Sequence, residues 1–289
     1  MAKWMPILVA AAGWLVLTPG RVAAWGKDGH EVIGRIADKH LDKTARAAVE
    51  ELLKDDQFKT LADGRLTNWA DSIRGSAVYR DKYPKSDLWH YVNIDVDADL
   101  AQIDLVAACK NGDCVRGAIL KFQAVLKDSA KPLQERREAL FFVAHFVGDL
   151  HQPLHCGERN KDRGGNLLKV LVNADDREPT NLHKVWDTVL VAKAQGTLSA
   201  ADYSTRLGDN LSAEKLKEYQ KGTLDVWMVE SHKICHEKVY QDKGEPIPAD
   251  GVAATLSGDY LKDGAATVEV QLVRGGVRLA QLLNDTFKE

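Results

Sequence analysis

The sequence predicts a mainly α-helical protein with a minor β hairpin, built as one domain behind a short export signal. Three observations lead to this prediction. Apolar residues recur at helical spacing through most of the chain. Residues 1–24 have the charge and the apolar run of a signal peptide. Residues 25–289 contain no internal repeat, low-complexity tract or linker, and their number fits one large domain with a sizeable core.

The export signal begins with a positive charge at Lys3, followed by a mostly apolar run from Met5 to Leu17. A Pro-Gly pair ends the run, and small residues at 22–24 offer a cleavage site. A membrane anchor is the alternative, but the run is shorter than the roughly 20 apolar residues of a spanning helix. We therefore predict a mature protein that is secreted or periplasmic, monomeric and free of the membrane.

The helices are predicted from apolar faces, taken in chain order. The first three faces lie within residues 32–37, 66–73 and 115–126. Pro132 suits the first turn of a long helix, which is apolar nearly all round from Ala139 to Val147 and is therefore expected to be central and buried. Later helices are predicted over 182–194, 212–221, 223–240 and 267–287. The two predicted β segments are Leu88–Ile94 and Leu167–Val172.

The charge balance argues against a basic nucleic-acid-binding surface. The formal net charge is -3, and loss of Lys3 and Arg21 with the export signal would make the mature chain more acidic by two charges. If the protein handles phosphates, a source other than lysine and arginine must supply most of the positive field.

The four cysteines predict two disulfides, because an even number behind an export signal is typical of oxidised secreted proteins. Cys109 with Cys114 is favoured, since the segment between them is a tight polar turn with Gly112 at its tip. That pairing leaves Cys156 with Cys235. A cysteine-rich zinc site is the alternative, but free thiols oxidise outside the cell.

Polar residues within apolar helices are the strongest sign of function. His145 and Asp149 are four residues apart and share a helix face, and His183 and Asp187 have the same spacing. His155 follows just beyond the expected end of the long helix. Imidazole with carboxylate suits Zn²⁺, and a metal offsets the cost of burying these groups. A buried histidine hydrogen-bonded to aspartate, without metal, is the alternative.

The predicted mature N-terminus adds a further pair of candidates. A free α-amino group on Trp25 has a reference pKa near 7.7–8.0, so it can lose its proton and bind a metal together with its own carbonyl oxygen. His30 is close enough in sequence to complete such a site. The alternative is that Trp25 is a hydrophobic plug and that His30 begins a helix.

Two further segments carry candidate groups. Asp71 lies one turn before Arg74, and His90 stands on a short stretch beside the aromatic ring of Tyr91. Taken singly, Asp71 is more often a solvated helix residue and His90 a core residue.

Together, these segments resemble the zinc-dependent S1/P1 nucleases, which share the phospholipase C/P1 nuclease fold. The resemblance runs in order from residue 25 to about 187 through WGKDGH, WADSIR, LWHYVNI, HFVGDLHQPLH, GGN and NLHKVWD. The last hundred or so residues are similar only in helical character and in WMVES at 227–231.

The resemblance implies a trinuclear zinc site, and each ligand position of the family is filled in this sequence. One zinc would take Asp71, His90, His145 and Asp149. A second would take the amino nitrogen and carbonyl oxygen of Trp25, His30 and the other oxygen of Asp149. The third would take His155, His183 and Asp187.

Three Zn²⁺, three aspartates and one hydroxide would leave the site a charge of about +2, which attracts an anionic phosphate in an acidic protein. Zinc lowers the pKa of a bound water toward about 7. The resemblance implies that Asp71 orients the nucleophile, that Arg74 steadies a phosphate oxygen, and that the product carries a 5′-phosphate.

The implied substrates are single-stranded DNA and RNA and nucleotides, because a base-stacking ring tolerates any sequence and a duplex hides its base faces. Tyr91 is the expected ring, with core packing as its alternative, and Asn93 and Asn166 are expected to contact substrate. Cleavage of 3′-mononucleotides is a second candidate activity. Two alternative functions stand beside the nuclease. A zinc phospholipase C usually has Glu where Asp187 stands, and a non-catalytic secreted zinc-binding protein would not need Arg74.

Overall fold

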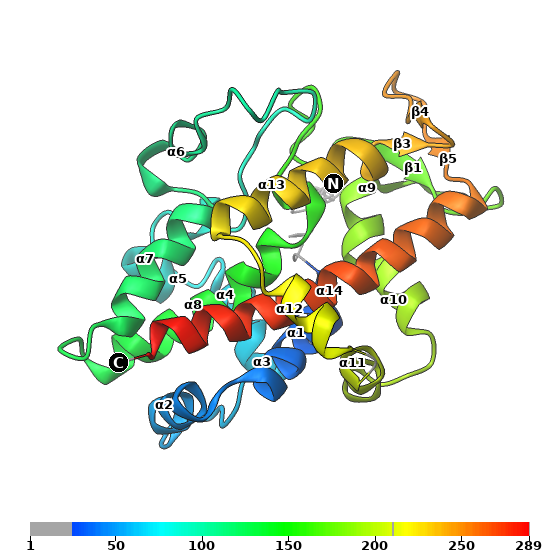
Figure 1. The fold of residues 1–289 in the computed structure, drawn as a ribbon. Helices are drawn as coiled ribbons and strands as arrows, with labels where there is room; N and C mark the ends of the chain where they lie inside the picture. Colours follow the sequence, from blue (N-terminus) through cyan, green and yellow to red (C-terminus); the bar gives the residue numbers. More distant parts are fainter. Residues whose placement is uncertain (1–24, 210, 289) are drawn as a thin grey trace, which may run out of the picture.

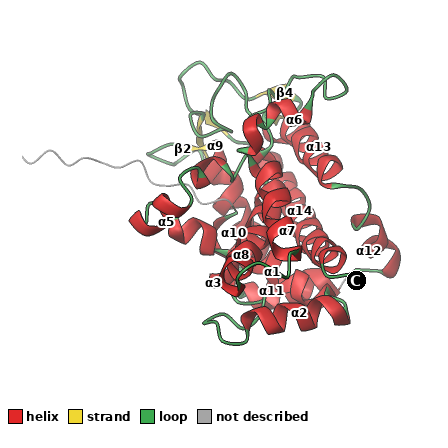
Figure 2. Ribbon diagram, turned by 90° about the vertical axis from the view of Figure 1, so that its left-hand side faces the viewer, coloured by secondary structure: helices red, strands yellow, loops and turns green. Residues whose placement is uncertain are grey.

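The computed structural model describes residues 25–209 and 211–288, so the predicted export signal lies outside the described residues. Helices form most of this part of the chain, and the few short strands gather at one end (Figures 1 and 2). This confirms the predicted mainly α class. None of the helices in the described ranges is both long enough and apolar enough to cross a membrane.

In chain order, the helices are α1 (Gly26–His40), α2 (Lys43–Leu53), α3 (Gly64–Thr67), α4 (Trp69–Ile73), α5 (Ala77–Lys82), η1 (Ser86–Leu88), α6 (Leu105–Ala108), η2 (Lys110–Gly112), α7 (Val115–Lys127), α8 (Leu133–Leu150), η3 (Pro153–His155), α9 (Leu182–Lys184), η4 (Val185–Val189), α10 (Leu190–Gln195), α11 (Ala200–Asp209), α12 (Ala213–Tyr219), α13 (Leu224–Ile234), η5 (Cys235–Val239) and α14 (Gly258–Thr286). The elements η4 and η5 are π-helices, and the other η elements are 3₁₀ turns.

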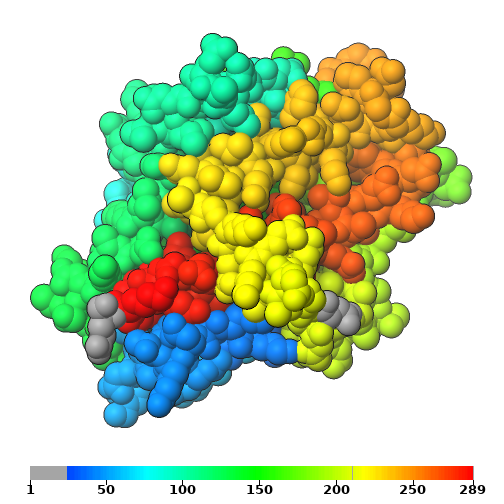
Figure 3. Space-filling view, viewed as in Figure 1, coloured from blue at the N-terminus to red at the C-terminus, as the bar shows by residue number. Residues whose placement is uncertain are grey.

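Helix α8 is the centre of the core, as predicted. It is buried without interruption from Glu138 to Leu150, and α7 packs along it, while α14 contacts both α1 and α8. The first and last helices of the described residues therefore pack against each other. Figure 3 shows the C-terminal part of α14, in red, against the blue N-terminal segment, and α14 also contacts α2. A single cluster of buried apolar residues extends from Trp25 to Leu283.

The predicted helix over 66–73 is broken at Asn68, which separates α3 from α4. The Asn68 backbone leaves the helical region at ψ 0°. Its side-chain amide donates to the carbonyls of Gly64, at 2.6 Å, and Lys27, at 3.0 Å. These bonds tie the short helices to the start of α1.

The predicted strand Leu88–Ile94 is wrong. This stretch is the end of a 3₁₀ turn followed by irregular chain, because its backbone bonds go to single residues in different segments. Val92 N donates to His155 O at 2.8 Å, and Tyr91 O accepts from Val115 N at 3.1 Å. The second prediction is confirmed within 167–172 by β1 (Lys169–Leu171).

Strand β1 pairs antiparallel with β2 (Thr180–Asn181) and parallel with β5 (Ala254–Thr255), in the order β2-β1-β5. A separate hairpin joins β3 (Gln241–Asp242) to β4 (Glu245–Pro246). Helix α14 begins earlier than the predicted residue 267, because the Ser257 side chain caps it by accepting from Tyr260 N. Helices α2, α5 and α11 were not among the predicted elements.

The cysteines follow the prediction only in part. Cys109 and Cys114 form the predicted disulfide, with Cα atoms 5.3 Å apart. Cys156 and Cys235 do not form the second one, and both thiols are free and buried. The Cys156 Sγ instead donates to Leu150 O at 3.3 Å. Burial raises the pKa of both thiols, which keeps them protonated.

Candidate metal centre

The side chains predicted as metal ligands converge in the structure. Every one of them belongs to a group whose ligand atoms lie within 4.8 Å of one another. The three groups are His30, Asp71 and His145; His90, His145 and Asp149; and His155, His183 and Asp187. They come from α1, α4, the stretch after η1, α8, η3, α9 and η4. Residues far apart in sequence therefore meet around the C-terminal end of α8.

Asp149 is the hub of this centre and is fully buried. Its Oδ2 lies 2.9 Å from His90 Nδ1 and 3.3 Å from His145 Nε2. Its Oδ1 lies 3.3 Å from His30 Nε2. The two oxygens of one carboxylate thus face different imidazoles.

A second focus forms around His183. Its Nε2 lies 3.2 Å from His155 Nε2 and 3.3 Å from Asp187 Oδ2. Gln152, fully buried, donates from Nε2 to Asp187 Oδ1 at 2.5 Å and accepts from Leu154 N through Oε1. Gln152 therefore fixes the Asp187 carboxylate with Oδ2 toward the histidines. The sequence reasoning missed Gln152, although its position inside HQPLH, between two ligand candidates, is a usable signal.

Three of the imidazoles are anchored by backbone carbonyls on their outer side. The Nδ1 atoms of His145, His155 and His183 lie 2.7, 2.6 and 2.6 Å from Thr67 O, His90 O and Gly164 O. A carbonyl only accepts, so each Nδ1 carries a proton, and the Nε2 atoms of the neutral His155 and His183 rings present lone pairs to the centre. This is the usual outer arrangement of metal-binding histidines.

The electrostatics divide the centre into two parts. Burial lowers the pKa of His155 to about 3 and that of His183 to about 4, so both rings are neutral at neutral pH. Burial would also lower the pKa of His145, but Asp149 and Asp71 raise it to about 9. Burial would raise the pKa of Asp149, yet its histidine neighbours, His145 first, hold it well below its usual value.

The donor set fits metal ions. Six of the buried polar atoms that have no hydrogen-bond partner among the described residues lie at this centre: both nitrogens of His30, Asp71 Oδ2, His90 Nε2, Asp149 Oδ1 and Asp187 Oδ2. Leaving a buried polar group unpaired costs about 1–3 kcal/mol. Nitrogen and carboxylate oxygen are ligands that suit Zn²⁺, so bound cations would satisfy most of these atoms together.

Trp25 is fully buried, and its indole Nε1 donates to Gly148 O at 2.8 Å. In the full chain its main-chain nitrogen is a peptide N–H, which donates to the Asp187 carboxylate. The family resemblance implies that a free amino group on Trp25 would lie beside His30 and Asp149. In the full chain, the peptide nitrogen of Trp25 bonds to Asp187 instead.

The remaining predicted residues surround the centre. Arg74 bridges Asp71, at 3.3 Å, and Asp87, at 3.0 Å. Asn93 is exposed and does not point into the core. Tyr91 is half-buried. Asn166 is also half-buried, and its side-chain amide donates to Arg163 O at 2.9 Å.

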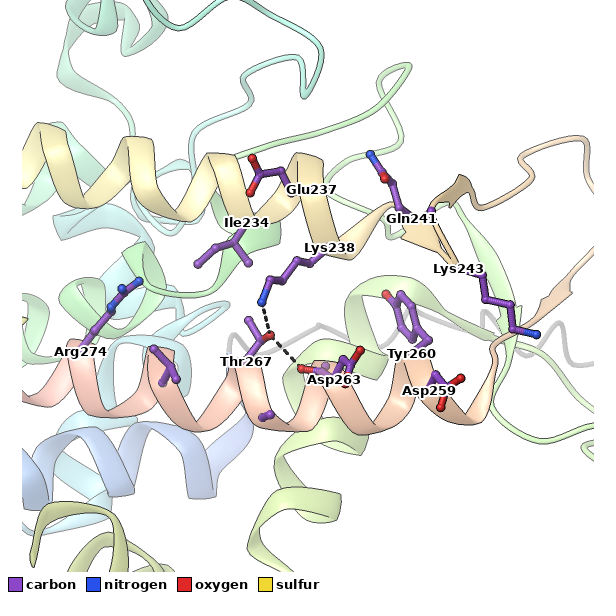
Figure 4. A pocket seen from close by; sticks show the side chains of 14 residues that line it. Ile234, Glu237, Lys238, Gln241, Lys243, Asp259, Tyr260, Asp263, Thr267 and Arg274 are labelled. Carbon is purple, nitrogen blue, oxygen red and sulfur yellow. Dashed lines mark hydrogen bonds between the residues drawn. The ribbon is translucent and has the colours of Figure 1, made fainter. Parts of the chain in front are cut away.

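A separate cavity of about 650 Å³ lies between the α13–η5 segment and α14. Figure 4 shows Lys238 reaching across it to Thr267, with acidic and basic side chains mixed around the rim. Its lining includes none of the candidate metal ligands. The candidate metal ligands therefore lie at the end of α8 and not in this cavity.

Comparisons with known proteins place the chain in a family. The sequence profile of the S1/P1 nucleases matches residues 25–288. The chain is 31% identical to "Endonuclease 2" of Arabidopsis thaliana, covering 97% of each protein. It is 28% identical to "Nuclease S1" of Aspergillus oryzae, covering 98% of each, and 25% identical to "Nuclease P1" of Penicillium citrinum, covering 90% of this chain and 97% of that one. These matches and the convergent histidines and aspartates show that the chain belongs to the S1/P1 nuclease family and is a hydrolase that acts on phosphodiester bonds.

Proposed function

We propose that residues 25–289, released by cleavage after Ala24, form a secreted endonuclease that uses three zinc ions. It hydrolyses single-stranded DNA and RNA to products with 5′-phosphates, and it also acts on 3′-mononucleotides. The observation that carries this proposal is the position of Asp149, whose Oδ2 faces His90 and His145 while its Oδ1 faces His30. Relatives named as nucleases and endonucleases support the same activity.

The residues that would hold the ions fall into the three predicted sets. Asp149 would be shared by the two closer ions, and His155, His183 and Asp187 would hold the third. When bound, zinc supplies a Lewis acid for phosphate oxygens and lowers the pKa of water toward about 7. The same charge would attract an anionic substrate to an acidic protein.

The residues of the chain then divide the remaining tasks. Asp71 keeps Oδ2 without a hydrogen-bond partner, so this oxygen is available to accept a hydrogen bond from the attacking water and to orient it. Arg74 is held against Asp71 by its NH1 and against Asp87 by its Nε. In this role its guanidinium would donate to a phosphate oxygen as negative charge develops.

Preference for unpaired strands would come from the surface beside His90. Tyr91 is half-buried and Asn93 is exposed, both within three residues of that ligand candidate. A ring there stacks on a base only when the base face is free, which a duplex does not allow. An amide at position 93 has one acceptor and one donor group, so it suits either kind of base edge.

The test is metal analysis of the processed protein together with a substrate panel. We expect three zinc ions per chain and hydrolysis of single-stranded DNA, RNA and 3′-AMP that stops on chelation and returns with zinc. Duplex DNA should be cut more slowly, and phosphatidylcholine should be left intact. Release of phosphocholine would instead favour the phospholipase, and zinc binding without hydrolysis of any substrate would favour the non-catalytic alternative.

A further inference from the structure

The loop that anchors His183 has an unusual backbone. Between η3 and β1 the chain contains a run of residues with positive φ: Asn160, Lys161, Arg163, Gly164 and Gly165, at 54°, 60°, 59°, 61° and 76°. Three of these are not glycine, and an L side chain in this region is strained. Such a conformation persists only where surrounding contacts impose it.

Gly164 is the point of this loop that touches the candidate metal centre. Its carbonyl oxygen lies 2.6 Å from His183 Nδ1. A Cβ at position 164 would lie 2.3 Å from Leu154 O, so only glycine fits against that backbone. The loop therefore reaches His183 in one close-packed position, and a small shift of its backbone would withdraw the carbonyl.

Asp162 is the group that holds the loop in this shape. Its Oδ1 accepts from Gly165 N at 2.9 Å and from Arg159 N at 3.2 Å. Both of its oxygens lie 2.8 Å from the hydroxyl of Tyr240. Tyr240 is almost completely buried at the end of η5, so the hydroxyl is a fixed donor.

A second contact ties the same loop to the same tyrosine. The Arg159 guanidinium lies 4.7 Å from the centre of the Tyr240 ring. It donates to Ile247 O at 2.7 Å and to Tyr240 O at 3.4 Å. The loop is thus clamped to the segment that contains Tyr240, from a part of the chain that supplies none of the predicted ligands.

We propose that Tyr240 and Asp162 are positioning residues for His183. Their hydrogen bond holds the loop so that Gly164 O accepts the hydrogen bond from His183 Nδ1–H, which keeps Nε2 directed at Asp187 and His155. This inference rests on the proposed function in one respect, because it assigns the third metal position as the group that benefits. Outer partners of this kind typically change metal affinity by about 10- to 100-fold.

The experiment compares Tyr240→Phe with Tyr83→Phe in the processed protein. Tyr240→Phe removes only the hydroxyl that reaches Asp162. Tyr83→Phe is the matched control, because it removes another phenol-to-carboxylate bond, to Glu138, about two helical turns before His145 on α8. Zinc affinity is measured by competition with a chelator, and the ¹⁵N spectrum of His183 reports which of its nitrogens carries the proton.

For Tyr240→Phe we expect one zinc ion to bind about 10- to 100-fold more weakly, with the other two unchanged. The His183 Nδ1–H signal should weaken or exchange faster, even in metal-free protein. Tyr83→Phe should leave both readouts unchanged. Unaltered zinc affinity and an unaltered His183 spectrum in Tyr240→Phe would overturn the proposal, as would equal losses in both variants.

Asp162→Asn provides a second route if Tyr240→Phe folds poorly. The amide keeps an oxygen acceptor but offers only one, so a partial effect on the same zinc ion and on the His183 signal is expected. Failure of the proposed function is recognised separately, because the unsubstituted protein would then bind no zinc or hydrolyse no nucleic acid. In that case the His183 spectrum of the metal-free variants still decides whether Tyr240 positions the ring.

Discussion

Helix α8 connects two regions that are held together in opposite ways. One is the aromatic cluster of Tyr83, Trp89, Phe122, Phe142 and Phe146, in which Phe142 stacks on Phe122 with ring centres 4.2 Å apart. The other is the candidate metal centre, where several buried nitrogens and oxygens have no hydrogen-bond partner among the described residues. The regions meet at Phe146, whose ring lies 5.0 Å from that of His90.

The difference shows what each region needs from outside the chain. Aromatic rings complete their contacts with one another and gain stability from burial alone. Buried carboxylates and imidazoles must obtain compensating charge, from a proton or a cation. The pKa of about 9 at His145 shows the first solution, since the metal-free centre keeps a proton beside Asp149 and Asp71. Bound zinc would be the second.

The largest expected effect separates the regions by metal dependence. Asp149→Asn should lower turnover of single-stranded DNA by more than about 1000-fold, because loss of one charge-stabilising group already costs about 10²–10³ and Asp149 would serve two ions. It should also remove more than one zinc per chain, whereas Asp187→Asn should remove about one. Zinc analysis and initial rates on both variants make the measurement. Equal losses in the two variants would contradict a bridging role.

The aromatic side of the comparison predicts loss of stability without loss of zinc. Phe142→Ala should lower the free energy of unfolding by about 3–5 kcal/mol, while the folded fraction keeps its full zinc content. Leu133→Ala, at a partly exposed position on the same helix, is the control and should change stability by less than about 0.5 kcal/mol. Urea denaturation with zinc present gives the change in the free energy of unfolding for both variants. Zinc analysis of the folded protein gives its metal content. Loss of zinc from folded Phe142→Ala would mean that the two regions are not separable.

The N-terminus sharpens the comparison, because Trp25 contributes both an apolar ring and a main-chain nitrogen. A protein with one extra residue before Trp25 keeps the ring but turns the amine into a peptide N–H. We expect it to hold fewer zinc ions and to lose about 10- to 100-fold in activity, with little change in stability after chelation. Mass spectrometry confirms the terminus before rates are compared. Full activity with a blocked N-terminus would show that the amine is not a ligand.

The smallest effect is expected at the exposed rim of the metal centre. Asn93→Asp replaces an amide that donates and accepts by a carboxylate that only accepts. It should widen the differences in rate among homopolymers, by less than about tenfold, in favour of bases that present donors. Turnover of four homopolymers by the native and substituted proteins is the measurement. An unchanged ranking and spread would mean that Asn93 does not contact a base.

The sequence predicted the parts of the centre that obey local rules. His145 with Asp149, and His183 with Asp187, were recognisable because four-residue spacing puts two side chains on one helix face. The predicted strand around Tyr91 is wrong. Alternating apolar residues give the same sequence pattern whether the backbone pairs with one strand or with scattered segments. The break at Asn68 depends on a bond to Lys27 O, 41 residues away.

Some contacts between residues far apart in the sequence could not be predicted at all. Tyr240 and Asp162 are 78 residues apart, and neither belongs to a recognisable metal-binding pattern. The predicted pairing of Cys156 with Cys235 rests only on the pairing of the other two cysteines, which carries no information about where a thiol points. In the structure Cys156 is directed at Leu150 O.

The carbonyl anchors of the three histidines have a consequence for folding. They join residues that are 78, 65 and 19 positions apart in the chain, so no short fragment contains a complete, oriented donor set. The folding chain must close loops of 65 residues or more before any complete, oriented donor set exists. Zinc would then stabilise molecules that have already folded, because it binds the native state and not early compact forms. Zinc supply would therefore set how long each molecule survives more than how quickly it folds.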